Sequence, residues 1–157
     1  MAGILSGHSF RFLFQEDSGT VDRGTWWRGF SMIALPLVLM TAIWLALSGN
    51  AMAPVADNIP QPSGWTALAH IYLLLYAVAI LLAAICYYNL GAKRLRARKQ
   101  TPALAGLLPL AALLAGAAHW VAPRVGDALP FWTATAFDLV ALAILVWNVA
   151  EMGVRKD

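Results

Sequence analysis

Four long apolar stretches alternate with short polar segments along the chain, at about residues 25–47, 65–90, 103–122 and 130–150. A helix needs about 20 apolar residues to cross a hydrocarbon core about 30 Å thick. The stretches lack the period-two alternation of barrel strands, and in lipid a helix pairs all of its own backbone groups. The pattern predicts an all-α integral membrane bundle of four transmembrane helices over residues 25–157. A polar N-terminal segment, residues 1–24, precedes it.

The composition agrees with a membrane protein. Of the 157 residues, 61% are hydrophobic and only 12% are charged, whereas about a quarter of the residues are charged in ordinary soluble domains. The polar segments are too short to form a domain with a core of its own. Cys86 is the single cysteine, so an internal disulfide is impossible.

The basic residues predict the orientation of the helices. One set of polar segments holds ten of them: Arg11, Arg23, Arg28, Lys93, Arg94, Arg96, Arg98, Lys99, Arg155 and Lys156. The two opposite loops hold one, Arg124. Because basic residues collect in cytoplasmic loops, both termini are expected in the cytoplasm.

The basic segments also predict the partners. The five cations from Lys93 to Lys99 are expected in a loop among anionic lipid headgroups, each contributing about 1 kcal/mol. Arg23 and Arg28, which flank Trp26 and Trp27, are expected to set the depth of the first helix. A specific lipid or protein site is the alternative. Charge restricted to loops argues against a nucleic-acid-binding surface.

The tryptophans lie close to the predicted helix ends: Trp26, Trp27, Trp44, Trp65, Trp120, Trp132 and Trp147. This placement is typical of the aromatic belt that anchors helices at the membrane interface. In the N-terminal segment Phe10, Phe12 and Phe14 would share one face if the chain were extended. The segment is expected to lie on the cytoplasmic interface, with a loosely ordered tail as the alternative.

Ionisable groups inside membrane helices are functional candidates because burying them in lipid is expensive. Asp138 lies eight residues into the fourth stretch, on a helical stripe that continues to Asn148. We expect Asp138 to face the bundle interior and to hydrogen-bond another helix. Proton or ligand handling and contact with a partner subunit are the alternatives. Glu151 is expected to pair with a cation of the 93–99 segment.

Two histidines, His70 and His119, lie near the predicted periplasmic ends of the second and third helices. Two such imidazoles could ligate a haem iron axially. In the ordinary alternative each makes a hydrogen bond near the interface, one of them with Asp138. We expect no cofactor, because no attachment motif is present and no Cys/His metal cluster occurs.

Two stretches resemble a known family of small bacterial inner-membrane proteins. They are Gly19-Thr20-Val21-Asp22-Arg23-Gly24-Thr25-Trp26-Trp27 and Lys93-Arg94-Leu95. The first stretch is similar to the segment that leads into the first helix in domain of unknown function 805. The second stretch is similar to the Arg-Arg-Leu that follows the second helix in that family. Its members include YhaH-type proteins. That family continues with His-Asp and then Gly-Trp, where this chain has Arg96-Ala97 and Pro102-Ala103. The resemblance implies a bacterial inner-membrane location but no activity.

The chain lacks a Gly-rich phosphate loop, a nucleophile elbow and an HExxH pattern. The sequence therefore predicts a non-catalytic accessory or assembly subunit that contacts a larger membrane complex or its lipids. The first alternative is a haem-binding electron-transfer subunit that uses His70 and His119. The second is a small oligomeric transporter or channel that uses Asp138.

Overall fold

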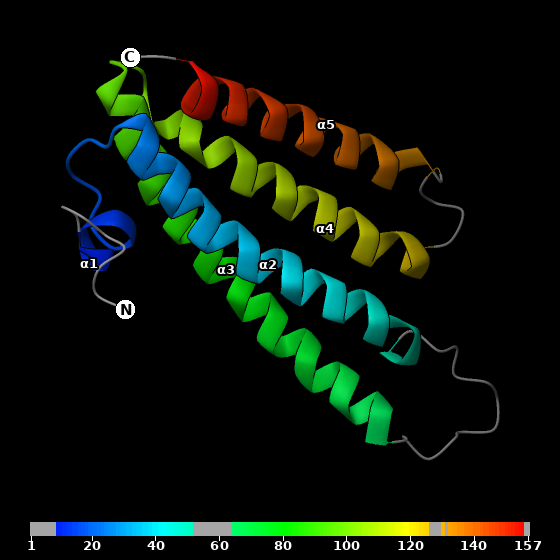
Figure 1. The fold of residues 1–157 in the computed structure, drawn as a ribbon. Helices are drawn as coiled ribbons and strands as arrows, with labels where there is room; N and C mark the ends of the chain where they lie inside the picture. The colour runs from blue at the N-terminus through cyan, green and yellow to red at the C-terminus, as the bar shows by residue number, and fades with distance from the viewer. Residues whose placement is uncertain (1–8, 52–63, 126–129, 131, 156–157) are drawn as a thin grey trace. The chain divides into compact units, whose positions relative to one another are not determined.

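The computed structural model describes residues 9–51, 64–125, 130 and 132–155, and all regular structure among them is helical (Figure 1). The elements are α1 (Phe10–Phe14), α2 (Arg23–Ala51), α3 (Gly64–Ala97), the 3-10 helix η1 (Pro102–Gly106), α4 (Leu107–Val125), α5 (Trp132–Asn148) and the π-helix η3 (Val149–Val154). Most of the loop of residues 48–64 and residues 126–129 of the last loop lie outside the described residues.

Four segments are long and apolar enough to cross a membrane: Arg23–Ser48, Gly64–Ala97, Pro102–Ala122 and Trp132–Val154. They overlap the four stretches read from the sequence, so the all-α fold and the four candidate spans are confirmed. The spans tolerate proline in two ways. Pro36 lies inside α2, which continues through it, and Pro109 lies in the first turn of α4, where a missing N–H is least disruptive.

The chain divides into two compact units. The hairpin unit is Ser31–Ile85, and the terminal unit is Met1–Phe30 together with Cys86–Asp157. The long helices α2 and α3 each contribute residues to both units.

Hydroxyl groups connect α2 to α3 in the hairpin unit. The Tyr72 hydroxyl donates to the carbonyl of Met40 at 2.7 Å. The Thr41 hydroxyl donates to the carbonyl of Leu37, so the Tyr76 hydroxyl, 2.7 Å away, is the donor in its bond to Thr41. Interhelical hydrogen bonds of this kind contribute about 0.6–2 kcal/mol each in membranes. This network was not predicted from the sequence, although Tyr72 and Tyr76 stand one helical turn apart.

In the terminal unit α4 and α5 run side by side in opposite directions (Figure 1). Small side chains are buried on α4, where Ala111 and Ala115 are 6% and 7% exposed. They stand one turn apart and therefore share a face of the helix. Small residues at this spacing let two helix backbones approach closely.

Helix α3 extends beyond its predicted end at residue 90 and reaches Ala97. Its 34 residues span about 51 Å, compared with about 30 Å for the hydrocarbon core. Lys93, Arg94 and Arg96 therefore lie on the helix and not in a loop, which corrects the sequence prediction. Lysine, arginine, leucine and alanine are all strong helix formers, so the helix does not stop where the apolar stretch stops. It ends where Lys99 adopts a positive φ of 56°.

Asp22 caps the start of α2. Its carboxylate accepts the backbone N–H groups of Gly24 at 3.1 Å and Thr25 at 3.3 Å, and its carbonyl accepts the N–H of Trp26 at 2.9 Å. These bonds satisfy N–H groups that have no partner within the helix. A side-chain hydrogen bond with Thr25 is the main cause that lowers the pKa of Asp22 below its ordinary value of 3.8.

We expect the Asp22→Ala variant to lose about 1 kcal/mol of stability at neutral pH, as is usual for a removed N-cap. Because folding lowers the pKa of Asp22, its contribution is full above the unfolded value of 3.8 and is lost as the pH falls through the folded value. Thermal unfolding in detergent at pH 7 and pH 3 measures both effects. The difference in melting temperature between wild type and variant should be smaller at pH 3 than at pH 7. An equal difference at both pH values would contradict the capping role of Asp22.

Candidate functional site

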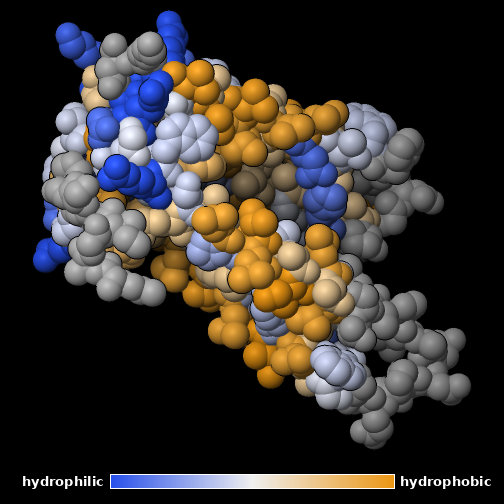
Figure 2. Space-filling view, in the orientation of Figure 1, coloured by the Kyte–Doolittle hydropathy of each residue, from blue (hydrophilic) through white to orange (hydrophobic). Residues whose placement is uncertain are grey.

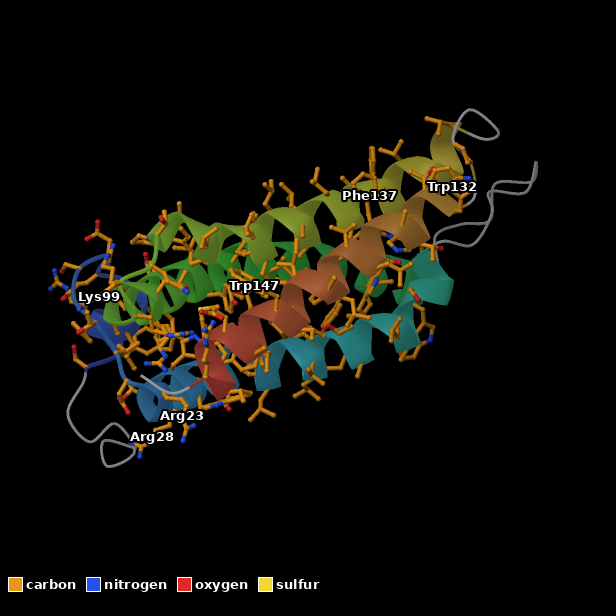
Figure 3. All side chains as sticks on the ribbon, turned by 90° about the horizontal axis from the view of Figure 1, so that it is seen from above. Arg23, Arg28, Lys99, Trp132, Phe137 and Trp147 are labelled. Carbon is orange, nitrogen blue, oxygen red and sulfur yellow. The ribbon has the colours of Figure 1, made fainter. Side chains whose placement is uncertain are left out.

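Hydrophilic side chains gather at one end of the terminal unit, where α1 and the last residues of η3 lie, whereas apolar side chains cover the helices (Figure 2). Arg23, Arg28 and Lys99 lie at this end, and Trp132 lies at the other (Figure 3). Buried and part-buried polar side chains connect the segments here. We call the set of six the polar clamp: Asn89, Lys93, Arg94, Arg98, Gln100 and Glu151.

Lys93 holds the N-terminal segment. Its side chain is fully buried, and Nζ donates to the carbonyls of Leu13 and Glu16. The ammonium group also lies 5.1 Å from the centre of the Phe12 ring, within the range of a cation–π contact. Carbonyl oxygens and the aromatic face together replace the water that this cation loses on burial.

Neighbouring side chains of α3 bind the same segment. Asn89 Nδ2 donates to the carbonyl of Phe14 at 2.7 Å, and Arg96 donates to the carbonyl of Asp17. Leu13 and Phe14 are 1% and 3% exposed. Residues 10–14 thus form a short packed helix, so an extended conformation and a loosely ordered tail are both wrong for them. The location of the segment at the cytoplasmic interface stays a prediction. Residues 1–8 lie outside the described residues.

Arg94 holds the opposite end of the chain. It is fully buried, Nε donates to the carbonyl of Met152 at 3.0 Å, and a terminal nitrogen donates to the carbonyl of Arg155 at 3.3 Å. The last carbonyls of a helix have no partner within it and carry partial negative charge. A guanidinium group is suited to this position because its fixed fork of donors can serve several carbonyls.

Glu151 is the anion of the polar clamp. Its carboxylate lies 2.6 Å from Arg98, accepts from Gln100 Nε2 at 2.6 Å and lies 3.1 Å from Arg155. The Arg98 and Glu151 side chains are only 9% and 10% exposed. The prediction that Glu151 pairs with a cation of the 93–99 segment is confirmed.

These contacts correct the assignment of the whole basic segment to lipid headgroups. Lys93 and Arg94 are fully buried and Arg98 is nearly so, which leaves Lys99 exposed and Arg96 partly exposed. The headgroup assignment is therefore wrong for Lys93, Arg94 and Arg98. Their positive charge is used inside the protein, on backbone carbonyls and on Glu151.

Two neighbouring tryptophans differ in role. Trp26 is fully buried and stacks on Phe30 with ring centres 5.0 Å apart, so the interface-anchor interpretation is wrong for it. Trp27 is 38% exposed, and its Nε1 donates to the carbonyl of Gly153 at 2.9 Å. Both rings press against Gly153, where an added Cβ would lie 2.7 Å from Trp27 and 2.8 Å from Trp26. The π-helix η3 thus places a glycine where only a hydrogen fits.

The second polar site lies within the candidate membrane spans. His119 Nε2, on α4, lies 2.8 Å from Asp138 Oδ2, on α5. The sequence alternative in which one histidine pairs with Asp138 is therefore confirmed. Asp138 follows Trp132 by six residues, which places it about 9 Å along the axis from the start of α5.

The pair is exposed, and this corrects the expectation that Asp138 faces the bundle interior. The side chains of His119 and Asp138 are 60% and 49% exposed. Both ionisable side chains therefore stay accessible although they bond α4 to α5. Asn148, on the same predicted stripe, does face inward, since it is 1% exposed and Nδ2 donates to the carbonyl of Ile144 at 2.8 Å.

His70 belongs to the hairpin unit, where its Nδ1 lies 2.7 Å from the carbonyl of Thr66 on its own helix. The haem hypothesis stays a prediction. In the part of the chain that the structure describes, no group of three potential metal ligands occurs.

No protein-family model, no curated protein and no solved structure matches this chain. The resemblance to domain of unknown function 805 therefore stays a prediction. The two stretches that carry it have a structural role here, because both contact η3: Trp27 binds the carbonyl of Gly153, and Arg94 binds the carbonyl of Met152.

Proposed function

We propose that this chain is a non-catalytic, multi-pass protein of the bacterial inner membrane that acts as an accessory or assembly subunit of a larger membrane complex. The observation that supports this proposal most strongly is the exposed His119–Asp138 pair. Both residues lie within the candidate spans Pro102–Ala122 and Trp132–Val154, and about half of each side chain is uncovered.

An uncovered polar pair is unfavourable in lipid. Charged side chains near the centre of a membrane helix cost about 2.5–3.5 kcal/mol on insertion scales. The bond between His119 and Asp138 reduces this cost but leaves polar surface that acyl chains cannot hydrogen-bond. A polar group on a neighbouring protein helix would satisfy it. This is why we favour a subunit contact over a chain surrounded by lipid alone.

The arrangement of the termini supports a cytoplasmic location for both. The three basic segments lie at one end of the terminal unit. Lys93 contacts residues 13–16 there, and Arg94 contacts residues 152–155. Basic segments at the same end belong on one side of the membrane, and an excess of arginine and lysine marks the cytoplasmic side.

Affinity purification of the tagged chain from membranes, in mild detergent, tests the proposal. We expect a native gel to show a species larger than the monomer and mass spectrometry to identify a different membrane protein in it. A combined His119→Leu and Asp138→Leu variant should recover at least about tenfold less of that protein. Loss of one hydrogen bond to a charged group, about 1.5–3 kcal/mol, is enough for this change.

Leu139→Ala is the matched control, because Leu139 is also exposed on α5 but neighbours Asp138 on a different face of the helix. It should recover the partner at the wild-type level. Recovery of the wild-type chain without any other membrane protein would count against the proposed function.

A further inference from the structure

We infer that the exposed His119–Asp138 pair docks against the same pair in a second copy of this chain, which lies parallel to the first in the membrane. The inference shares one premise with the proposed function, namely that protein and not lipid covers this pair. It goes further in naming what covers the pair, a second copy of this chain, so that the different membrane protein of the proposed complex binds the dimer and is lost when the dimer is lost.

The His119–Asp138 pair has hydrogen-bonding atoms besides the two that bond to each other. The bond within the chain uses Nε2 of His119 and Oδ2 of Asp138. The hydrogen bonds recorded among the described residues use neither His119 Nδ1 nor Asp138 Oδ1. The pair therefore offers one further imidazole nitrogen and one further carboxylate oxygen. With a protonated imidazole the nitrogen is a donor, and the carboxylate oxygen is an acceptor.

A partner that satisfies this surface must supply an acceptor and a donor at the same spacing. A second His119–Asp138 pair supplies both. In a twofold arrangement His119 Nδ1 of each copy would donate to Asp138 Oδ1 of the other copy. The same hydrogen bond would therefore form twice in the dimer. The opposite charges of imidazolium and carboxylate would alternate around the four groups, which favours the contact in a medium of low dielectric constant.

The depth of the two residues permits this symmetry. Because their side chains are 2.8 Å apart, His119 and Asp138 lie at nearly the same level along the two helices. Two parallel copies in one membrane are related by a twofold axis along the membrane normal. That operation keeps depth unchanged, so it brings each pair to the level of the other.

The surface beside the pair allows a close approach. Gly116 precedes His119 by three residues on α4, and nothing lies within 4 Å of the position that a Cβ would take there. Ala112, a turn further on, is also exposed. Small residues do not attract a partner by themselves, but they let two helix backbones approach to the distance at which the polar groups can meet.

Cysteine cross-linking in native membranes tests the inference. Cys86 is first replaced by alanine, and Gly116→Cys is introduced as the probe, with copper-phenanthroline as the oxidant of the two thiols. Leu114→Cys is the matched control, because Leu114 is 45% exposed and lies two residues away, about 200° around the helix. Circular dichroism and an unchanged melting temperature show that each variant is folded.

We expect at least tenfold more disulfide-linked homodimer from Gly116→Cys than from Leu114→Cys. Adding His119→Leu and Asp138→Leu should reduce that homodimer at least tenfold. Exchanging the two residues, as His119→Asp with Asp138→His, should restore it, because the exchanged pair is still self-complementary.

The other outcomes separate this inference from the proposed function. Homodimer formation without any other membrane protein in the purified complex supports the inference and contradicts the larger complex. Cross-linking of Gly116→Cys to a different protein overturns the inference and leaves the proposed function standing. Both the inference and the proposed function are overturned if the folded Gly116→Cys variant yields no cross-linked product and the wild-type chain migrates as a monomer.

Discussion

Replacing Glu151 with leucine is expected to lower the free energy of unfolding by about 3–5 kcal/mol, the usual effect of removing one partner from a buried ion pair. Arg98 lies 2.6 Å from Glu151, and its side chain is only 9% exposed, so the substitution would leave a buried cation without its anion. Gln100 Nε2, which donates to the same carboxylate at 2.6 Å, would also lose its acceptor.

The midpoint of thermal unfolding in detergent, followed by circular dichroism, measures this loss. A double variant with Arg98→Leu and Glu151→Leu is the informative control, because removing both charges leaves neither one unpaired. It should be more stable than Glu151→Leu alone. If the single variant unfolds at the wild-type temperature, the ion pair does not hold this end of the chain together.

Replacing Gly153 with valine is expected to cost about 1–3 kcal/mol, the usual penalty for overfilling a packed site. The new Cβ would lie 2.7 Å from Trp27 Cζ2 and 2.8 Å from Trp26 Cζ3. Trp26 is fully buried and stacked on Phe30, so its ring has little room to move. Movement of Trp27 would break its hydrogen bond to the carbonyl of Gly153.

The same unfolding measurement tests this prediction, with tryptophan fluorescence as a second signal. Gly64→Ala serves as the control, because a Cβ at Gly64 has no atom within 4 Å, and it should unfold like the wild type. A Trp27→Ala change combined with Gly153→Val should cost less than the sum of the two single changes, because it makes room for the valine. Simple additivity of the two effects would show that the rings and Gly153 do not compete for space.

The sequence by itself determined the all-α class and the four candidate spans, because a membrane span needs a long apolar stretch and a helix pairs its own backbone groups. It also indicated that Asp138 and Glu151 need polar partners, because an unpaired charge is unfavourable in any apolar surrounding. These conclusions depend on local composition and on the chemistry of one side chain at a time.

Only the tertiary structure decided which surroundings each polar residue has. The sequence predicts that Lys93 and Arg94 are loop cations among lipid headgroups. In the structure they are buried against the carbonyls of Leu13 and Met152. Every residue carries a carbonyl, so sequence letters do not reveal which distant carbonyl will receive a cation. The exposed position of Asp138 has a similar origin, because the packing of α4 against α5 decides how much of each side chain remains uncovered.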